Sequence, residues 1–138
     1  ETVRDRNLDG KWDAWIYYEH GHATRAQYDN NFDGKPDEWW TISNSSPVTL
    51  EKDTDFNGVP DEFCAYTNGL LHQMEIKPNG SRLATQRWIY QNGVVSDIQR
   101  GRDSNGNFSV VTHYDPFFTP ANNLSDEPSS FHLLLPSK

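Results

Sequence analysis

The sequence predicts an all-β protein, an antiparallel meander of 24-residue hairpin repeats that forms either an open twisted sheet or a small barrel. Similar acidic loops recur every 24 residues, and a fixed internal period is typical of repeat architectures. Between the loops, short stretches alternate hydrophobic and polar residues, which is the pattern of strands. Nine Gly and eight Pro supply frequent turns, while helical periodicity is scarce.

The repeat is clearest in three nine-residue loops that start at Asp5, Asp29 and Asp53. All three follow the pattern D-x-[DN]-x-[DN]-G-x-x-D. The same period reaches a remnant without acidic residues at 77–85 and a degenerate copy at 101–109. We interpret the last two as ordinary turns, since Asn, Ser and Gly are common turn residues.

Each loop is followed by a predicted strand rich in aromatic and β-branched residues. These strands cover 15–18, 39–42, 63–66 and 87–90, and the turn residues Gly21, Ser45, Gly69 and Gly93 also stand 24 apart. The sequence from Tyr90 to Val94 predicts a three-residue hairpin loop in which these two residues pair. Even-numbered residues then pair with even-numbered residues, and the even period preserves this parity along the chain.

The even-numbered face is the predicted core, because successive strand residues point to opposite faces. Its members are Ile16, Tyr18, Ala26, Trp40, Ile42, Leu50, Cys64, Tyr66, Met74, Ile76, Trp88, Tyr90, Ile98, Val110 and Tyr114. The odd-numbered face mixes polar residues with Trp15, Tyr17, Trp39, Phe63 and Ile89. That face is more apolar than a plain solvent face requires.

The composition divides the chain into a repeat domain, 1–115, and an extended tail, 116–138. The tail is rich in Pro and Ser, and proline at this density is incompatible with a central strand. It ends in an apolar segment that contains Phe131, Leu133, Leu134 and Leu135. We expect this segment either to fold back on its own sheet or to bind a neighbouring subunit.

The charge balance argues against several classes of partner. Twelve Lys and Arg against twenty Asp and Glu give a net charge of −8 and an isoelectric point near 4.9, which repels nucleic acid and anionic lipid. No apolar run approaches the roughly 20 residues of a membrane helix, so no membrane insertion is expected. A single cysteine, Cys64, excludes an intramolecular disulfide.

The three loops present the oxygen ligands that calcium prefers, with a Gly at position 6 for the sharp turn. We predict side-chain ligands at positions 1, 3, 5 and 9 and a backbone carbonyl at position 7. The predicted ligands are Asp5, Asn7, Asp9, Lys11 and Asp13; Asp29, Asn31, Asp33, Lys35 and Asp37; and Asp53, Asp55, Asn57, Val59 and Asp61. About three Ca²⁺ ions would offset six of the eight net negative charges. The alternative is that Asp, Asn and Gly only favour turns.

Between two strands, this loop pattern resembles the calcium loops of integrin α-subunit propellers and of related bacterial extracellular repeat proteins. The resemblance covers about residues 5–66 and implies calcium binding and an extracellular, secreted setting. It differs from an EF-hand, which has a bidentate Glu at loop position 12 and flanking helices. Here position 12 is Ile16, Trp40 or Cys64.

No catalytic constellation is visible, and we expect the protein not to be an enzyme. Trp15, Trp39 and Phe63 share one repeat position and could form a ladder on the odd face. Such a ladder would be a second core layer under the tail, a platform on which sugars stack, or a docking face for another subunit.

These features predict a non-catalytic, calcium-stabilised structural protein. We expect a self-assembling subunit, a homo-oligomer or polymer, of an extracellular filament or surface layer with tail-mediated contacts. The alternative is a carbohydrate-binding or adhesion module that uses the aromatic face. Four glycosylation sequons fall in predicted turns or in the tail, at Asn44, Asn79, Asn107 and Asn123.

Overall fold

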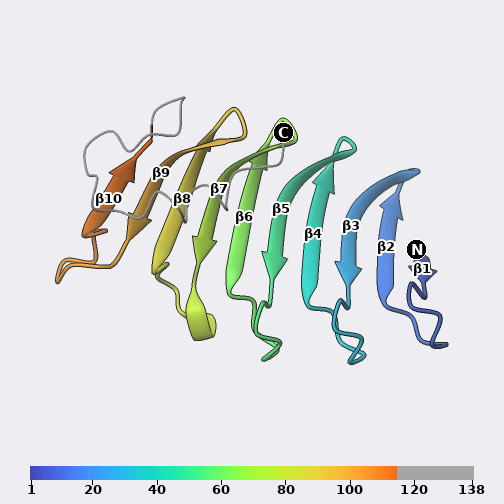
Figure 1. Cartoon of the computed structure of the whole chain (residues 1–138). Helices are drawn as coiled ribbons and strands as arrows, with labels where there is room; N and C mark the ends of the chain where they lie inside the picture. Colours follow the sequence, from blue (N-terminus) through green and yellow to red (C-terminus); the bar gives the residue numbers. More distant parts are fainter. Residues whose placement is uncertain (115–138) are drawn as a thin grey trace.

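The computed structural model describes residues 1–114 as one antiparallel sheet whose ten strands lie side by side in chain order (Figure 1). The strands are β1 (Thr2–Arg4), β2 (Ala14–Glu19), β3 (His22–Tyr28), β4 (Glu38–Ser43), β5 (Ser46–Lys52), β6 (Glu62–Thr67), β7 (Leu70–Ile76), β8 (Gln86–Gln91), β9 (Val94–Arg100) and β10 (Val110–His113). A short 3₁₀ helix, η1 (Pro78–Gly80), lies between β7 and β8. The sheet does not close, so the predicted meander is confirmed as an open sheet rather than a barrel. The tail at 116–138 and its apolar segment lie outside the described residues.

The hairpin turns contain two residues, not the predicted three. Gln91 pairs with Val94, which leaves Asn92 and Gly93 as the turn, with φ angles of 52° and 78°. Positive φ at both positions defines a type I′ turn, whose twist matches that of the flanking strands. The predicted pairing of Tyr90 with Val94 is therefore wrong.

A β-bulge next to each turn restores the predicted pairing of even-numbered residues with even-numbered residues. Tyr90 pairs with Val95, but the register then shifts, and Trp88 pairs with Ile98. Equivalent shifts occur between residues 17 and 18, 41 and 42, and 65 and 66. Because a bulge adds one unpaired residue to one strand, it compensates for the shorter turn. Even-numbered residues thus pair with each other along most of each strand.

A mostly apolar row crosses the even face of the sheet. It consists of Thr2, Ile16, Ala26, Trp40, Leu50, Cys64, Met74, Trp88, Ile98 and Thr112. The Trp40 ring lies against Tyr66, with 5.7 Å between the centroids. A buried cluster near the end of the repeat domain contains Trp88, Val95, Ile98 and Tyr114. The core therefore lies on the predicted face.

The core differs from the prediction at three residues: two predicted core residues are exposed, and one buried residue was not predicted. Tyr18 is 46% exposed and Val110 is 40% exposed, so both predictions are wrong. Tyr18 lies beyond the bulge, next to the turn, and Val110 begins the last described strand, so each has fewer neighbours. Val95, an odd-numbered residue, is 1% exposed because the bulge pairs it with Tyr90 and turns it toward the core.

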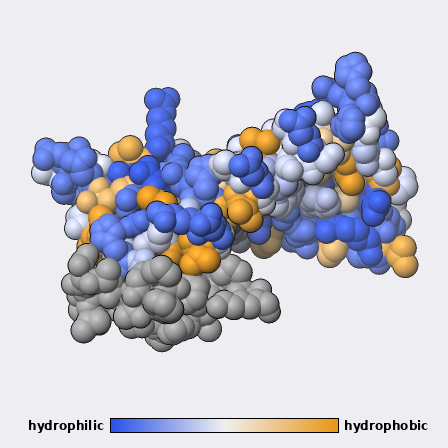
Figure 2. Space-filling view, turned by 90° about the horizontal axis from the view of Figure 1, so that it is seen from above, coloured by the Kyte–Doolittle hydropathy of each residue, from blue (hydrophilic) through white to orange (hydrophobic). Residues whose placement is uncertain are grey.

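The hairpin edge of the sheet is predominantly polar. Figure 2 looks down on this edge and shows small apolar areas separated by hydrophilic residues. Among residues 1–114, no helix has the length and hydrophobicity needed to cross a membrane.

Candidate metal-binding loops

Three loops project from the edge of the sheet opposite the hairpin turns (Figure 1). Loop 1 (5–13) connects β1 to β2, loop 2 (29–37) connects β3 to β4, and loop 3 (53–61) connects β5 to β6. Since strands of a meander alternate in direction, every second connection falls on this edge. The period of 24 residues thus places equivalent loop positions side by side.

The aspartate at position 1 of each loop accepts hydrogen bonds from the backbone around the glycine at position 6. In loop 2, Asp29 Oδ1 accepts from the Asp33 N–H at 3.2 Å, and Oδ2 accepts from the Gly34 N–H at 2.7 Å. Asp5 and Asp53 accept equivalent hydrogen bonds in the other loops. Gly34 has a φ of 92°, a conformation that favours glycine.

Positions 3 and 5 always combine one amide with one carboxylate. In loop 2, Asn31 Nδ2 donates to Asp33 Oδ2 at 3.1 Å. In loop 3 the types are exchanged, and Asn57 Nδ2 donates to Asp55 Oδ2 at 3.0 Å. Because an amide can donate to a carboxylate and a second carboxylate cannot, this combination avoids two adjacent carboxylates at positions 3 and 5.

Position 7 contributes a backbone N–H to these networks. The N–H groups of Lys11, Lys35 and Val59 donate to the side chains at position 5 at 2.8–2.9 Å. The carbonyl role that the sequence suggested for these residues stays a prediction.

The last aspartate closes the loop by bonding to position 2. Asp37 accepts from the backbone N–H of Asn30 at 2.7 Å and from Asn30 Nδ2 at 2.8 Å. Asp61 accepts from the hydroxyl of Thr54 at 2.9 Å. This contact explains why an aspartate at position 9 helps the fold even without a cation.

In loop 1, the position-2 residue that bonds to the last aspartate is Arg6. Arg6 also links loop 1 to loop 2. Its Nε donates to Asp13 Oδ1 at 2.7 Å, and its Nη2 donates to the carbonyl oxygen of Asp29 at 2.8 Å. The guanidinium also lies 5.2 Å from the ring centroid of Tyr28 and 5.7 Å from that of Phe32. Sequence reasoning missed Arg6, because no local pattern marks a residue that bridges two loops.

Arg6 also controls the charge state of Asp13. Burial alone would raise the pKa of this carboxyl, but side-chain and backbone hydrogen bonds from Arg6 outweigh burial and lower the pKa. In loop 1 the last carboxylate therefore already has a cationic partner.

Five buried aspartates form a row across the sheet at the base of the loops. Backbone hydrogen bonds join two pairs of neighbours in the row directly: the Asp29 N–H donates to the Asp13 carbonyl and the Asp53 N–H to the Asp37 carbonyl, both at 2.9 Å. The row consists of Asp13, Asp29, Asp37, Asp53 and Asp61, which are 1–9% exposed. Lys77 takes the next place, where its N–H donates to the Asp61 carbonyl.

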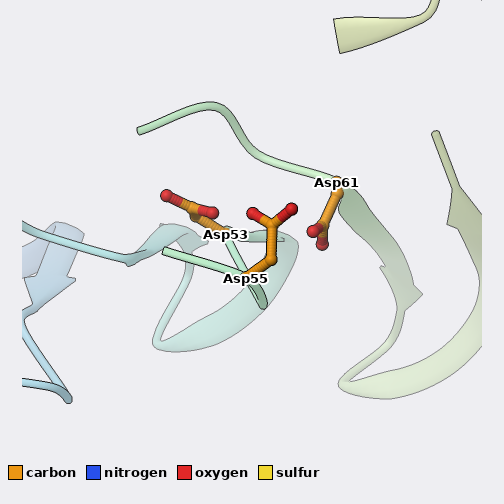
Figure 3. A group of neighbouring side chains, drawn as sticks. All are labelled: Asp53, Asp55 and Asp61. Carbon is orange, nitrogen blue, oxygen red and sulfur yellow. The ribbon is translucent and has the colours of Figure 1, made fainter. Parts of the chain in front are cut away.

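Loop 3 brings three carboxylates together. One oxygen each from Asp53, Asp55 and Asp61 lies within 4.8 Å of the others, so this cluster could hold a metal ion. Figure 3 shows Asp55 between the other two side chains. Loops 1 and 2 have Asn7 and Asn31 at the position of Asp55, so each offers an amide oxygen there instead. An all-oxygen donor set fits a hard cation such as calcium better than zinc.

The fourth and fifth copies of the repeat, at 77–85 and 101–109, lack this arrangement of three carboxylates. In the fifth, Asp103 accepts from the N–H groups of Asn105 at 2.9 Å and Asn107 at 3.0 Å. Arg102, at position 2, donates to the Ala84 carbonyl at 2.8 Å and thus bridges registers much as Arg6 does. In the fourth register, η1 replaces the loop.

The aromatic residues Trp15, Trp39 and Phe63 lie in one row of the odd face but not on adjacent strands. They belong to β2, β4 and β6, and the pairings place Gln27 and Glu51 between them. The expected ladder is thus interrupted by polar side chains. All three aromatic residues are partly buried.

Two hydroxyl side chains of residues 1–114 lie near a histidine: the exposed Thr67 Oγ1 is 2.9 Å from His72 Nδ1, and Ser96 is linked to His113 only through Asp97. The Ser96 hydroxyl donates to Asp97 at 2.9 Å, and Asp97 contacts His113, so the serine is not bonded to the base. Burial raises the pKa of the Cys64 thiol to about 12, with Glu62 adding to the effect.

Three of the four glycosylation sequons fall on exposed residues of the described chain. Asn44 and Asn79 lie in turns with φ angles of 50° and 54°, and Asn107 follows the Gly106 turn. Asn123 lies outside the described residues.

In comparisons with known proteins, no protein-family model and no curated protein sequence matches the chain.

Proposed function

We propose that this chain is a non-catalytic, calcium-stabilised structural repeat protein that works outside the cell as a subunit of a filament or surface layer. The observation that carries this proposal is the repetition of one loop geometry at three neighbouring places on one sheet edge. Calcium would bind these native loops and not the unfolded chain, so it would stabilise the fold by mass action.

Calcium would bind the three loops with different strengths. Each loop supplies three carboxylates and one amide at positions 1, 3, 5 and 9, and in loop 3 one oxygen each of Asp53, Asp55 and Asp61 lies within 4.8 Å of the others. Loop 2 has its amide at position 3, on Asn31, and its third carboxylate at position 5, on Asp33. In loop 1 the guanidinium of Arg6 competes for Asp13. We therefore expect loops 2 and 3 to bind calcium more tightly than loop 1, since ligand charge tunes calcium affinity.

Assembly is supported by exposed apolar side chains at one end of the loop edge. Leu8 is 86% exposed and Trp12 is 57% exposed, both in loop 1. In loop 2 the equivalent of Leu8 is Phe32, which contacts Arg6 of the preceding loop. A loop from a second copy could cover Leu8 in the same way, and head-to-tail contacts of this kind produce filaments.

The test is light scattering of the whole chain in about 2 mM calcium and in excess chelator, a concentration suited to weak extracellular sites. Particles much larger than the 15.9 kDa monomer that disappear on chelation support the proposal. A chain that ends at Asp115 tests whether the tail mediates the contact. A monomer under every condition refutes the assembly role, while a calcium-dependent melting temperature would still support the metal sites.

A further inference from the structure

The odd face carries a row in which aromatic and hydrogen-bonding side chains alternate. Across the strands in order, the row reads Val3, Trp15, Gln27, Trp39, Glu51, Phe63, Glu75, Arg87, Gln99 and Val111. The even face carries the buried cluster, so the odd row is not needed for that core. The described residues form a single sheet, and none of them builds a second layer over this row.

The spacing of the row is set by the sheet. Neighbouring strands lie about 4.8 Å apart, so residues on alternate strands are separated by roughly 10 Å. Trp15 on β2 and Trp39 on β4 are therefore one such step apart, with Gln27 between them. This step is close to the length of one disaccharide in an extended β-1,4-linked glycan.

The chemistry of the row suits uncharged sugars. The apolar C–H face of a pyranose stacks on an aromatic ring, and its equatorial hydroxyls bond to planar amides and carboxylates. The Tyr17 hydroxyl donates to Gln27 Oε1 at 3.4 Å, which leaves the Gln27 amide N–H groups for a ligand. Glu51 is exposed, and its charge disfavours uronate or sulfate groups.

We propose that the row from Trp15 to Glu51 binds an extended, uncharged β-1,4-linked polysaccharide that runs across the strands. Trp15 and Trp39 stack on every second sugar ring, and Gln27 and Glu51 bond to the rings between them. Phe63 extends the row, but the Lys77 ammonium lies 4.8 Å from its ring centroid and covers one face. This function goes beyond the structural role above and depends on neither calcium nor assembly.

The test is titration calorimetry of the full chain with cellohexaose and with chitohexaose. We expect at least one hexamer to bind, and its disaccharide to bind much more weakly because it cannot span both tryptophans. Trp39→Ala should weaken binding about tenfold or more, since it removes a large stacking surface. Tyr18→Ala is the matched control, because Tyr18 is 46% exposed next to the β2–β3 turn and lies outside the row. It should bind like the unaltered chain.

Several outcomes would overturn this inference. They are the absence of binding to both hexamers, equal losses in the Trp39→Ala and Tyr18→Ala chains, and preferential binding of polygalacturonate, a polyanion. If Trp39→Ala fails to fold by circular dichroism, Trp15→Ala and the dependence on oligosaccharide length decide the question. Light scattering of the same samples reports on assembly separately, so failure of one proposal is distinguishable from failure of the other.

Discussion

The backbone N–H of Asp29 donates to the carbonyl oxygen of Asp13 at 2.9 Å, which places the first residue of loop 2 beside the last residue of loop 1. The sheet ladder thus continues into the loops, and the loops are not independent of one another. Arg6 reinforces the connection, because its guanidinium bonds to the carboxylate of Asp13 and to the carbonyl of Asp29. Local changes at one loop are therefore expected to affect its neighbour.

Stability at acid pH should depend on the contact between Arg6 and Asp13. The pKa of Asp13 is held below the ordinary 3.8, because hydrogen bonds from Arg6 outweigh the opposing effect of burial. A depressed folded-state pKa means that the contribution to stability is present above pH 3.8 and is lost as the pH falls through the lower folded value. Denaturant unfolding below about pH 5 measures this loss.

The matched variants for this experiment are Asp13→Asn and Arg6→Ala. Both should be less stable than the unaltered chain at neutral pH, and the difference should shrink as the solution is acidified. Arg82→Ala serves as the control, because Arg82 is exposed and outside the loops. A constant difference between the Asp13→Asn and unaltered chains at every pH would contradict the prediction.

Chelation should lower the melting temperature of the chain. At a hundredfold excess of calcium over the dissociation constant, each site contributes about 2.7 kcal/mol to the free energy of unfolding. Asp33→Ala should therefore reduce the response to calcium more than Asp103→Ala, which lies in the degenerate fifth register. Differential scanning calorimetry with and without calcium tests this order, and equal effects would refute the site assignment.

Loop 3 allows a sharper version of the calcium experiment. Asp55→Asn removes one carboxylate from the three-carboxylate cluster but keeps a side chain of the same shape. It should lower the calcium affinity of loop 3 below that of loop 2, which keeps three carboxylates. An unchanged affinity would show that Asp55 is not a ligand.

Replacing Leu8 with Asn should stabilise the protein. Leu8 has a φ of 62° and is 86% exposed, so it adopts a left-handed conformation without burying its side chain. Asn tolerates this conformation better, and we expect a gain of about 0.5–1 kcal/mol in the free energy of unfolding. Urea denaturation measures the change.

Two contrasting variants test the cause of that gain. Phe32→Asn changes an equivalent position with a φ of 60°, but it also removes the contact with Arg6, so it should gain less or lose stability. Leu83→Asn changes an exposed leucine without positive φ and should have no effect. A similar gain in the Leu83→Asn chain would show that removing an exposed apolar side chain, and not relieving the backbone conformation, is the cause.

Alkaline pH should destabilise the fold through Cys64. Burial, followed by the charge of Glu62, raises the pKa of this thiol from 9.0 to about 12. A raised folded-state pKa gives a contribution that is complete below pH 9.0 and is lost as the pH rises toward 12. Cys64→Ala should show a shallower decline of melting temperature over this range. The native thiol should also react slowly with alkylating reagents at neutral pH, because the thiolate is the reactive form.

The repeat, the strand positions and the core face could all be predicted from the sequence. Each depends on information carried within a few residues, such as the alternation around Trp40 and Trp88 or the spacing of Asp5, Asp29 and Asp53. An even period keeps side chains on one face from repeat to repeat, and the structure confirms this for Ala26 and Ile98.

Other features depend on contacts between distant parts of the chain, and only the tertiary structure decided them. Two-residue turns with bulges give the same parity as the three-residue turns that were predicted, so the pattern of hydrophobic residues could not separate them. The bulge buries Val95, although its odd number places it outside the predicted core face. The strand pairing places Gln27 between Trp15 and Trp39. The sequence by itself determined which residues point the same way along a strand, because that is a property of the local backbone. The neighbours of each residue, such as Arg6 for Asp13 and Asp29, were decided by the sheet ladder, which joins residues far apart in the chain.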